Sequence, residues 1–203
     1  MAYNVLGIHP GHNGSAALIS NGELIYYLEE ERLSRFKRDG NPFRSMIDIC
    51  SRYKVDELVI GGTLDFREFN KLPWTDENSY AALVRKFFPN IKVTFLNQEH
   101  HLLHASCAFY NSGFDKAAIL IIDGAGSLQT YPLGKENEVQ GWEAESIFIA
   151  EYPNQFKSIY KSYAKNQSAR IQLKEHDFDD AITITKTYEA VTHYLGWPSI
   201  EAG

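Results

Sequence analysis

Short apolar runs separated by polar turns open the chain. Residues 5–8, 15–20 and 23–29 each form such a run, and Asn21 and Gly22 stand between the last two. An Asn-Gly pair between two strand-like runs is typical of a two-residue hairpin turn. We therefore expect a three-stranded β-meander at the start of the chain.

Helical spacing follows this meander. Apolar side chains recur every three or four positions across residues 43–53, after Asn41 as an expected N-cap and Pro42 as a first-turn proline. Further along, the pattern predicts a strand at 58–61, a helix at 78–88 and a strand at 93–96. Alternating helices and strands predict a mixed α/β fold.

The second half of the chain begins like the first. After a helix from Asn97, an expected N-cap, to a stop at Gly113, an apolar run over 117–123 ends in a glycine-containing turn, as the run at 5–8 does. This repetition predicts a weak internal duplication. The elements expected after it are strands at 130–133 and 146–152, a polar irregular stretch at 158–176 and a helix at 181–195.

Composition narrows the class of protein. The 203 residues are 44% hydrophobic and 13% aromatic, and no run approaches the roughly 18 apolar residues of a membrane helix. A net charge of -6 offers no broad basic surface, which disfavours long nucleic acid as the main partner. The N-terminal residues have no apolar signal segment, so we expect a cytoplasmic protein. Cys50 and Cys107 are expected to be reduced, partly buried thiols.

A histidine pair carries the strongest chemical signal. His100 and His104 are four residues apart at the start of the predicted helix, so their imidazoles project from one face. Asp123, at the end of the next predicted strand, is placed to supply a carboxylate. Two neutral imidazoles and one carboxylate suit Fe(II), Zn or Mn with open positions for substrate oxygens. Surface or capping histidines would show the same spacing. Cys107 lies on the same helix face and could be a further ligand, but it is expected to be buried in packing.

Other polar segments allow two interpretations each. The turn PGHNG at 10–14 and the turn DGAGS at 123–127 place backbone amides where an anion could approach, through Gly11 and Asn13 or through Gly124, Gly126 and Ser127. Each turn is equally compatible with a simple tight connection. The charged run at 29–39 is typical of a solvated, ion-paired face. The acidic segment at 175–180 could bind a cation, but its carboxylates are more typical of a helix entry.

Taken in order, these segments resemble the ATP-dependent O-carbamoyltransferases of nodulation-factor and antibiotic biosynthesis. Each block alone is ordinary, and their common order makes the resemblance specific. The matching blocks are GIHPGHNGSAAL at 7–18, EEERLSRFKRD at 29–39, HHLLHA at 100–105, GFDKAA at 113–118 with Asp123 and Gly124, and YEAVT at 188–192. Asn13 and Gly14 depart from the family pattern, which often has an acidic residue followed by Ala.

The resemblance implies an actin-like, sugar-kinase-like α/β domain made of two RNase H-like halves, with mixed sheets and flanking helices. Residues 1–112 would form the first half, and residues 113–203 would begin a second half that is incomplete here. The chain would then be the N-terminal portion of a catalytic domain. Relatives continue into the rest of that half, which carries a further metal carboxylate and nucleotide contacts, and then into a carbamoyladenylate-forming domain. Alone, the chain is expected to lack turnover.

The resemblance also implies a reaction. Carbamoyladenylate, made from carbamoyl phosphate and ATP, would give its carbamoyl group to a hydroxyl of a small-molecule acceptor. His100, His104 and Asp123 would hold the metal, with iron favoured, while His12 would accept the proton and Lys37 would stabilise charge. The acceptor stays open among an amino sugar, a cephem, a lipo-oligosaccharide and a hydroxymethylated nucleotide. Two alternatives remain: a threonylcarbamoyl-type tRNA-modifying enzyme and a non-catalytic metal- or nucleotide-binding module.

Overall fold

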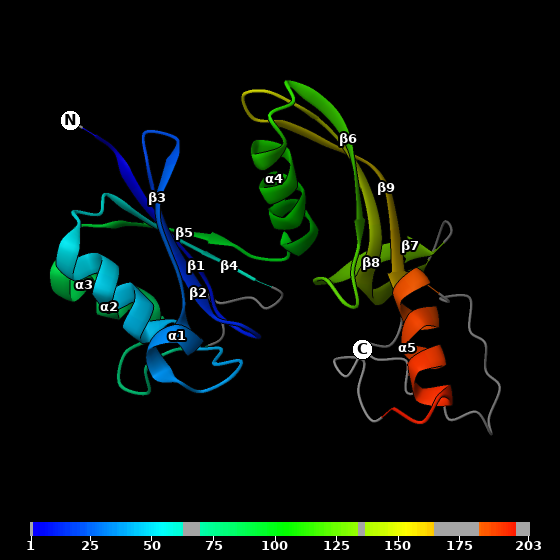
Figure 1. Cartoon of the computed structure of the whole chain (residues 1–203), viewed down its shortest axis with the longest axis horizontal. Coiled ribbons are helices and arrows are strands. Elements are labelled where there is room, and N and C mark those ends of the chain that lie inside the picture. The colour runs from blue at the N-terminus through cyan, green and yellow to red at the C-terminus, as the bar shows by residue number, and fades with distance from the viewer. Residues whose placement is uncertain (1, 63–69, 134–136, 165–182, 198–203) are drawn as a thin grey trace. The chain divides into compact units, whose positions relative to one another are not determined.

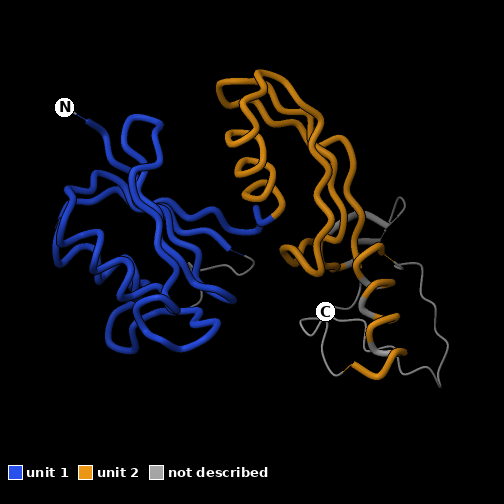
Figure 2. Tube along the Cα trace, viewed as in Figure 1, with its two compact units in different colours: residues 1–100 blue, residues 101–203 orange. Residues whose placement is uncertain are grey.

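The computed structural model describes residues 2–62, 70–133, 137–164 and 183–197 (Figure 1). These residues divide into two compact units, residues 1–100 and residues 101–203 (Figure 2). The boundary falls in the first turn of helix α4 (His100–Ser112). The backbone of α4 therefore fixes His100 relative to the rest of that helix.

Unit 1 is built on one five-stranded sheet of order β3-β2-β1-β4-β5. The strands β1, β2 and β3 are antiparallel, as the meander predicts, while β4 and β5 continue the sheet in parallel with β1. Asn21 and Gly22 both have positive φ, 49° and 90°, as the predicted hairpin turn requires. The strands are β1 (Asn4–His9), β2 (Ser15–Ser20), β3 (Glu23–Glu29), β4 (Glu57–Gly61) and β5 (Lys92–Leu96).

Three helices complete the described part of unit 1. They are α1 (Glu30–Ser34), α2 (Phe43–Arg52) and α3 (Ser79–Phe87). Buried residues alternate with half-buried ones in the middle of β1 and β2, and Leu6 of β1 is paired with Leu18 of β2. Both belong to one core cluster with Met46 of α2 and Tyr80 of α3, and all four are fully buried. Helices α2 and α3 therefore close one face of the sheet (Figure 1).

The start of α2 differs from the expectation. Pro42 is the N-cap residue, not Asn41, and no side chain of the cap position bonds to the helix. Instead, the Glu30 carboxylate accepts hydrogen bonds from the amides of Arg44 and Ser45, at 3.0 and 2.9 Å, and from the Ser45 hydroxyl at 2.8 Å. Glu30 is 1% exposed, so the prediction of a solvated face is wrong at this residue. A carboxylate from another helix thus satisfies the free amides of α2.

Helix α3 begins at Ser79, one residue after the predicted start, and Asn78 is its N-cap. This cap gives a testable prediction. The Asn78 side chain accepts hydrogen bonds from the amides of Tyr80 and Ala81, at 3.0 and 3.2 Å. Replacing Asn78 with Ala is expected to lower the free energy of unfolding by about 1 kcal/mol, because these amides lose their partner. Chemical denaturation followed by circular dichroism measures the change. Asn78→Asp, which keeps an acceptor, should restore most of it.

Unit 2 is built on a sheet whose described pairings are all antiparallel. The long central strand β8 pairs with β7 through its first part, with β6 through its second part, and with β9 on the other side. The prediction of an irregular stretch from residue 158 is wrong as far as residue 164, and residues 165–176 lie outside the described ones. The elements are β6 (Lys116–Ile122), β7 (Leu128–Leu133), β8 (Asn137–Glu151), β9 (Gln155–Ala164) and α5 (Ile184–Tyr194).

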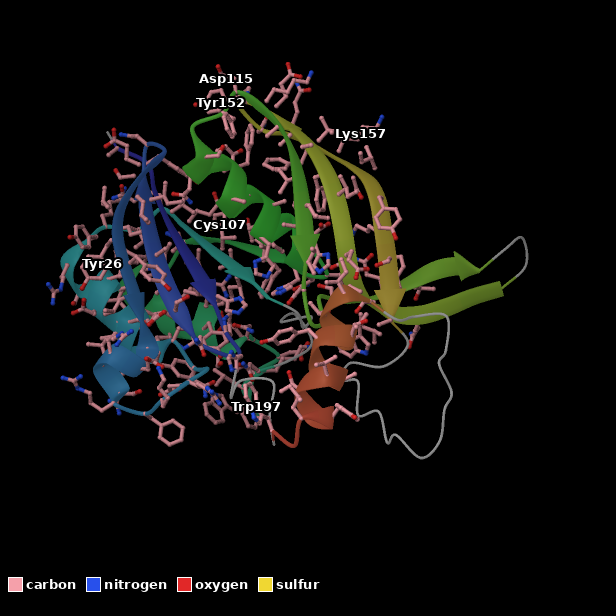
Figure 3. All side chains as sticks on the ribbon, turned by 45° about the vertical axis from the view of Figure 1, so that its right-hand side comes forward. Tyr26, Cys107, Asp115, Tyr152, Lys157 and Trp197 are labelled. Carbon is pink, nitrogen blue, oxygen red and sulfur yellow. The ribbon has the colours of Figure 1, made fainter. Side chains whose placement is uncertain are left out.

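Helix α4 packs on this sheet. Ala105 and Phe109 of the helix are buried against a cluster that includes Ile119, Ile121 and Phe148 of the strands. At the sheet end near the labelled residues Asp115 and Tyr152, the Tyr152 amide donates to the Asp115 carbonyl at 2.7 Å (Figure 3). The sheet and α4 thus form a small core of their own.

The ends of α4 test two expectations. The helix ends at Ser112, before Gly113 with φ 74°, as predicted. It begins at His100 and not directly after Asn97, because Gln98 adopts a φ of 58° between them. Asn97 is therefore not the N-cap residue. The described chain is α/β, with one mixed sheet, one antiparallel sheet and flanking helices.

Candidate metal centre

Three predicted ligands come together at the start of α4. One donor atom from each of His100, His104 and Asp123 can be chosen so that all lie within 4.8 Å of one another. The two histidines are one helical turn apart on α4, and Asp123 directly follows β6. The Nε2 atom of His104 lies 3.9 Å from Oδ2 of Asp123.

The backbone around Asp123 is held on both sides. Its amide donates to the Ala144 carbonyl at 3.0 Å, and its carbonyl accepts from the Thr185 hydroxyl at 2.7 Å. The carboxylate is also oriented, because Oδ1 accepts from the Gly124 amide at 2.7 Å. Consequently Oδ2 is the oxygen that is turned toward the histidines.

The donor set fits a divalent ion. Two imidazole nitrogens and a carboxylate oxygen suit Fe(II), Zn or Mn, and three protein ligands leave positions for other oxygens. Two donors bound at about 2.1 Å to one ion lie at most about 4.2 Å apart, so the observed spacing needs only small side-chain adjustments. The His104 side chain is 52% exposed, so the cluster is open to solvent at His104, whereas Oδ2 of Asp123 is buried.

His101 is a residue of this region to which the sequence analysis assigned no role. It is fully buried, its Nδ1 lies 2.7 Å from the Ser146 hydroxyl oxygen, and its Nε2 lies 3.8 Å from Oδ2 of Asp123. Its spacing of four and eight residues from Ala105 and Phe109 places it on the buried face of α4. This periodicity is a sequence signal that His101 is buried. The pair His100 and His104, one turn apart, is a stronger signal for a site on the other face of the helix.

The amides of the DGAGS turn already have protein acceptors. Gly124 donates to Asp123 Oδ1, Gly126 to the Glu143 carbonyl at 2.8 Å, and Ser127 to Glu143 Oε2 at 3.2 Å. A phosphate at these amides would have to compete with those bonds. The turn of these glycines and Ser127 therefore supports the position of Asp123 in the structure as described.

The remaining predicted residues belong to unit 1. The amides of Gly11 and Gly14 donate to the carbonyls of Gly40 and Asp39, both at 2.8 Å, so the PGHNG turn lies against the end of the charged run. A Cβ on Gly14 would lie 2.7 Å from the backbone of Gly40, which explains the need for glycine there. His12 and Asn13 are exposed at the tip of this turn.

Lys37, in the charged run, is exposed and has an acidic partner. Its Nζ lies 2.9 Å from Oε1 of Glu31, and the Arg38 amide donates to Oε2 of the same carboxylate at 3.0 Å. The hydrogen bonds from Arg38 and Lys37 hold the pKa of Glu31 below its usual range. The ion-paired face predicted for the charged run is present at Glu31.

The two cysteines differ in environment. Cys50 is buried in unit 1, whereas Cys107 on α4 is exposed, so the expectation of a buried Cys107 is wrong. Helical periodicity turns Cys107 away from the face that carries Ala105 and Phe109. Among the described residues, the candidate metal cluster does not include a cysteine.

This difference predicts selective thiol reactivity. Burial raises the pKa of the Cys50 thiol to about 11, so only about one thiol in a thousand would be a thiolate at about pH 8. We expect iodoacetamide to label Cys107 in the folded chain and to label Cys50 only after unfolding. Peptide mass spectrometry reads both sites. Equal labelling of both in the folded chain would contradict the described burial.

Comparisons with known proteins give a partial match. No family model matches the chain. The chain is 29% identical to the nodulation protein NolNO of Sinorhizobium fredii over 136 residues, which cover 57% of the chain and 20% of NolNO. It is 27% identical to the uncharacterized protein MJ1051 of Methanocaldococcus jannaschii over 213 residues, which cover 98% of the chain and 39% of that protein. The resemblance to NolNO therefore extends over about half of this chain.

A third relative matches the chain over a similar number of residues to MJ1051. The uncharacterized protein sll1178 of Synechocystis is 27% identical over 210 residues, which cover 85% of the chain and 33% of that protein. The chain thus spans about a fifth to two fifths of the length of these relatives. No helix in the described ranges is both long and apolar enough to cross a membrane.

Proposed function

We propose that the chain is part of a cytoplasmic, metal-dependent O-carbamoyltransferase. The observation that carries the proposal is the convergence of His100, His104 and Asp123, which the sequence resemblance assigns to one metal. The similarity to a nodulation protein supports the small-molecule branch of carbamoyl transfer. The net charge of -6 is less suited to a tRNA substrate, which favours this branch over a tRNA-modifying enzyme.

The topology of both units supports a duplicated domain. In unit 1, the strand that precedes the PGHNG turn has the antiparallel strands β2 and β3 on one side and the parallel strands β4 and β5 on the other. In unit 2, β6 precedes the DGAGS turn and is followed in the sheet by the antiparallel strands β8 and β9. We infer that residues 1–112 belong to one RNase H-like half and residues 113–203 to a second.

The proposed reaction is an acyl transfer. An acceptor hydroxyl oxygen attacks the carbamoyl carbon of carbamoyladenylate, a C–O bond to the acceptor forms, and the bond to AMP breaks. His12 would take the hydroxyl proton, and Lys37 would stabilise negative charge on the adenylate. Both residues are exposed on adjacent segments of unit 1, where a ligand could reach them.

His100, His104 and Asp123 would bind Fe(II), or Zn or Mn in its place. When bound, the ion supplies Lewis-acid stabilisation of the nucleotide phosphate. The fixed carboxylate and the helical spacing of the two imidazoles hold the donors close together before the ion arrives. Carbamoyladenylate itself would be formed from ATP and carbamoyl phosphate by a separate domain of the full-length protein, which the chain therefore needs as a partner.

A transfer assay on the full-length protein tests this function. The protein is incubated with Fe(II), ATP and ¹⁴C-carbamoyl phosphate, together with a panel of amino sugars, oligosaccharides and nucleosides as hydroxyl acceptors. We expect label in one acceptor class, and we expect His104→Ala to lose transfer while pyrophosphate release from ATP continues. Transfer that persists in His104→Ala would contradict the metal-dependent mechanism. ATP turnover with no transfer to any acceptor would favour a non-catalytic module.

A further inference from the structure

We propose that His101 is a positioning residue that orients the Asp123 carboxylate through its Nε2–H group, and that the Ser146 hydroxyl sets the tautomer of His101. This inference rests on the proposed metal site, because it assigns a second layer of residues to that site. All three residues belong to unit 2. The resemblance to carbamoyltransferases assigns no role to His101 or Ser146.

The distances favour one tautomer. Nδ1 of His101 lies 2.7 Å from the Ser146 oxygen, which is a hydrogen-bond distance, and a hydroxyl can act there as donor or acceptor. Nε2 lies 3.8 Å from Oδ2 of Asp123, which is longer than a hydrogen bond, so the two atoms interact through their charges. A carboxylate oxygen can only accept, so a lone pair on Nε2 would face another lone pair, whereas an N–H would be attracted. Ser146 is therefore assigned as the donor to Nδ1, and Nε2 carries the proton.

The imidazole ring has little freedom to move. A Cβ on Gly126 would lie 2.7 Å from both Cδ2 and Nε2 of His101, so the backbone of the DGAGS turn packs directly against the ring. That turn is fixed to β8 by the bonds of Gly126 and Ser127 to Glu143. The Glu143 carboxylate is in turn paired with Lys161 of β9. A ring held in this way can direct Nε2 at one oxygen without paying much conformational entropy.

The orientation matters for the proposed ligand. Oδ1 of Asp123 is engaged by the Gly124 amide, so Oδ2 is the oxygen available to an ion. The proton on His101 Nε2 would hold Oδ2 on the side where His104 Nε2 lies 3.9 Å away. Partners that orient ligands in this way typically change metal affinity by about 10- to 100-fold when they are removed.

Two measurements on this chain test the proposal. In the first, ¹⁵N-resolved NMR of the metal-free chain reads the tautomer of His101, and we expect a proton on Nε2 and none on Nδ1. In the second, anaerobic Co(II) titration, read by absorption, compares wild type with three variants. His101→Phe keeps a ring without nitrogens, His101→Gln returns an amide N–H near the Nε2 position, and Ser146→Ala removes the tautomer-setting hydroxyl. Cys107→Ser, an exposed change on the same helix, is the matched control.

The expected results separate this inference from the metal site itself. Wild type and Cys107→Ser should bind one Co(II) with equal affinity, His101→Phe should bind about 10- to 100-fold more weakly with an altered visible spectrum, and His101→Gln should recover most of the loss. Ser146→Ala should weaken binding in the same direction and decides the question if His101→Phe does not fold. A wild-type chain that binds no Co(II) overturns the metal site. Two results overturn the positioning role alone. One is normal Co(II) binding by wild type together with unchanged affinity and spectra in folded His101→Phe or Ser146→Ala. The other is a His101 proton on Nδ1.

Discussion

Replacing His104 with Ala is expected to weaken binding of a divalent ion to this chain by at least about 100-fold, more than the loss of a residue that merely orients a ligand. The substitution removes one of three donor atoms that lie within 4.8 Å of one another. His104 is largely exposed, so the change should leave the core of unit 2 intact. Anaerobic calorimetric titration with Fe(II) and with Zn(II) measures the loss, and thermal unfolding of the metal-free variant checks the fold.

Controls on the same helix sharpen this experiment. Cys107→Ser changes another exposed side chain of α4, a thiol outside the candidate cluster, and should leave the affinity unchanged. His100→Ala should reproduce the effect of His104→Ala, because both residues belong to the same cluster. If the two histidine variants bind as tightly as wild type, the ion is held elsewhere in the chain and the site is misassigned.

Replacing Glu30 with Ala is expected to lower the free energy of unfolding by about 3 kcal/mol. The carboxylate receives hydrogen bonds from Arg44, from the Ser45 amide and from the Ser45 hydroxyl in a buried position. Without it, the first amides of α2 lose their acceptor and the space left cannot admit bulk water freely. Denaturant unfolding of the variant against wild type gives the difference.

A neighbouring glutamate provides the matched control. Glu29 is partly exposed and pairs with the largely exposed Arg32 at 3.2 Å, so Glu29→Ala should cost less than about 1 kcal/mol. Equal losses for Glu29→Ala and Glu30→Ala would show that the capping of α2 by Glu30 contributes no special stability.

The sequence predicts those parts of the fold that depend only on residues close together in the chain. The meander and the Asn21-Gly22 turn are confirmed because each depends on conformations and bonds within a few residues. The approach of His104 and Asp123 also agrees with the prediction, since a helix followed directly by a strand returns the chain to the same end. The metal ligation itself stays a prediction.

Features that depend on partners distant in sequence could not be predicted. Glu30 stands in a run of charges and looks exposed, yet its acceptor oxygens meet the start of a helix 14 residues later. The polar residues at 158–164 form a strand because β8 supplies a pairing edge. The contact between His101 and Ser146 joins residues 45 positions apart in the sequence. In each case a tertiary contact overrides the local pattern.

X-ray absorption spectroscopy of the iron-loaded chain tests the central claim most directly, because it reads the ligands of the ion and not only the affinity. The account predicts one iron per chain with a first shell of nitrogen and oxygen only, and multiple scattering from two imidazoles that falls to one in His104→Ala. A sulfur ligand, or a wild-type spectrum without imidazole scattering, would contradict the assignment of His100, His104 and Asp123 as the metal site.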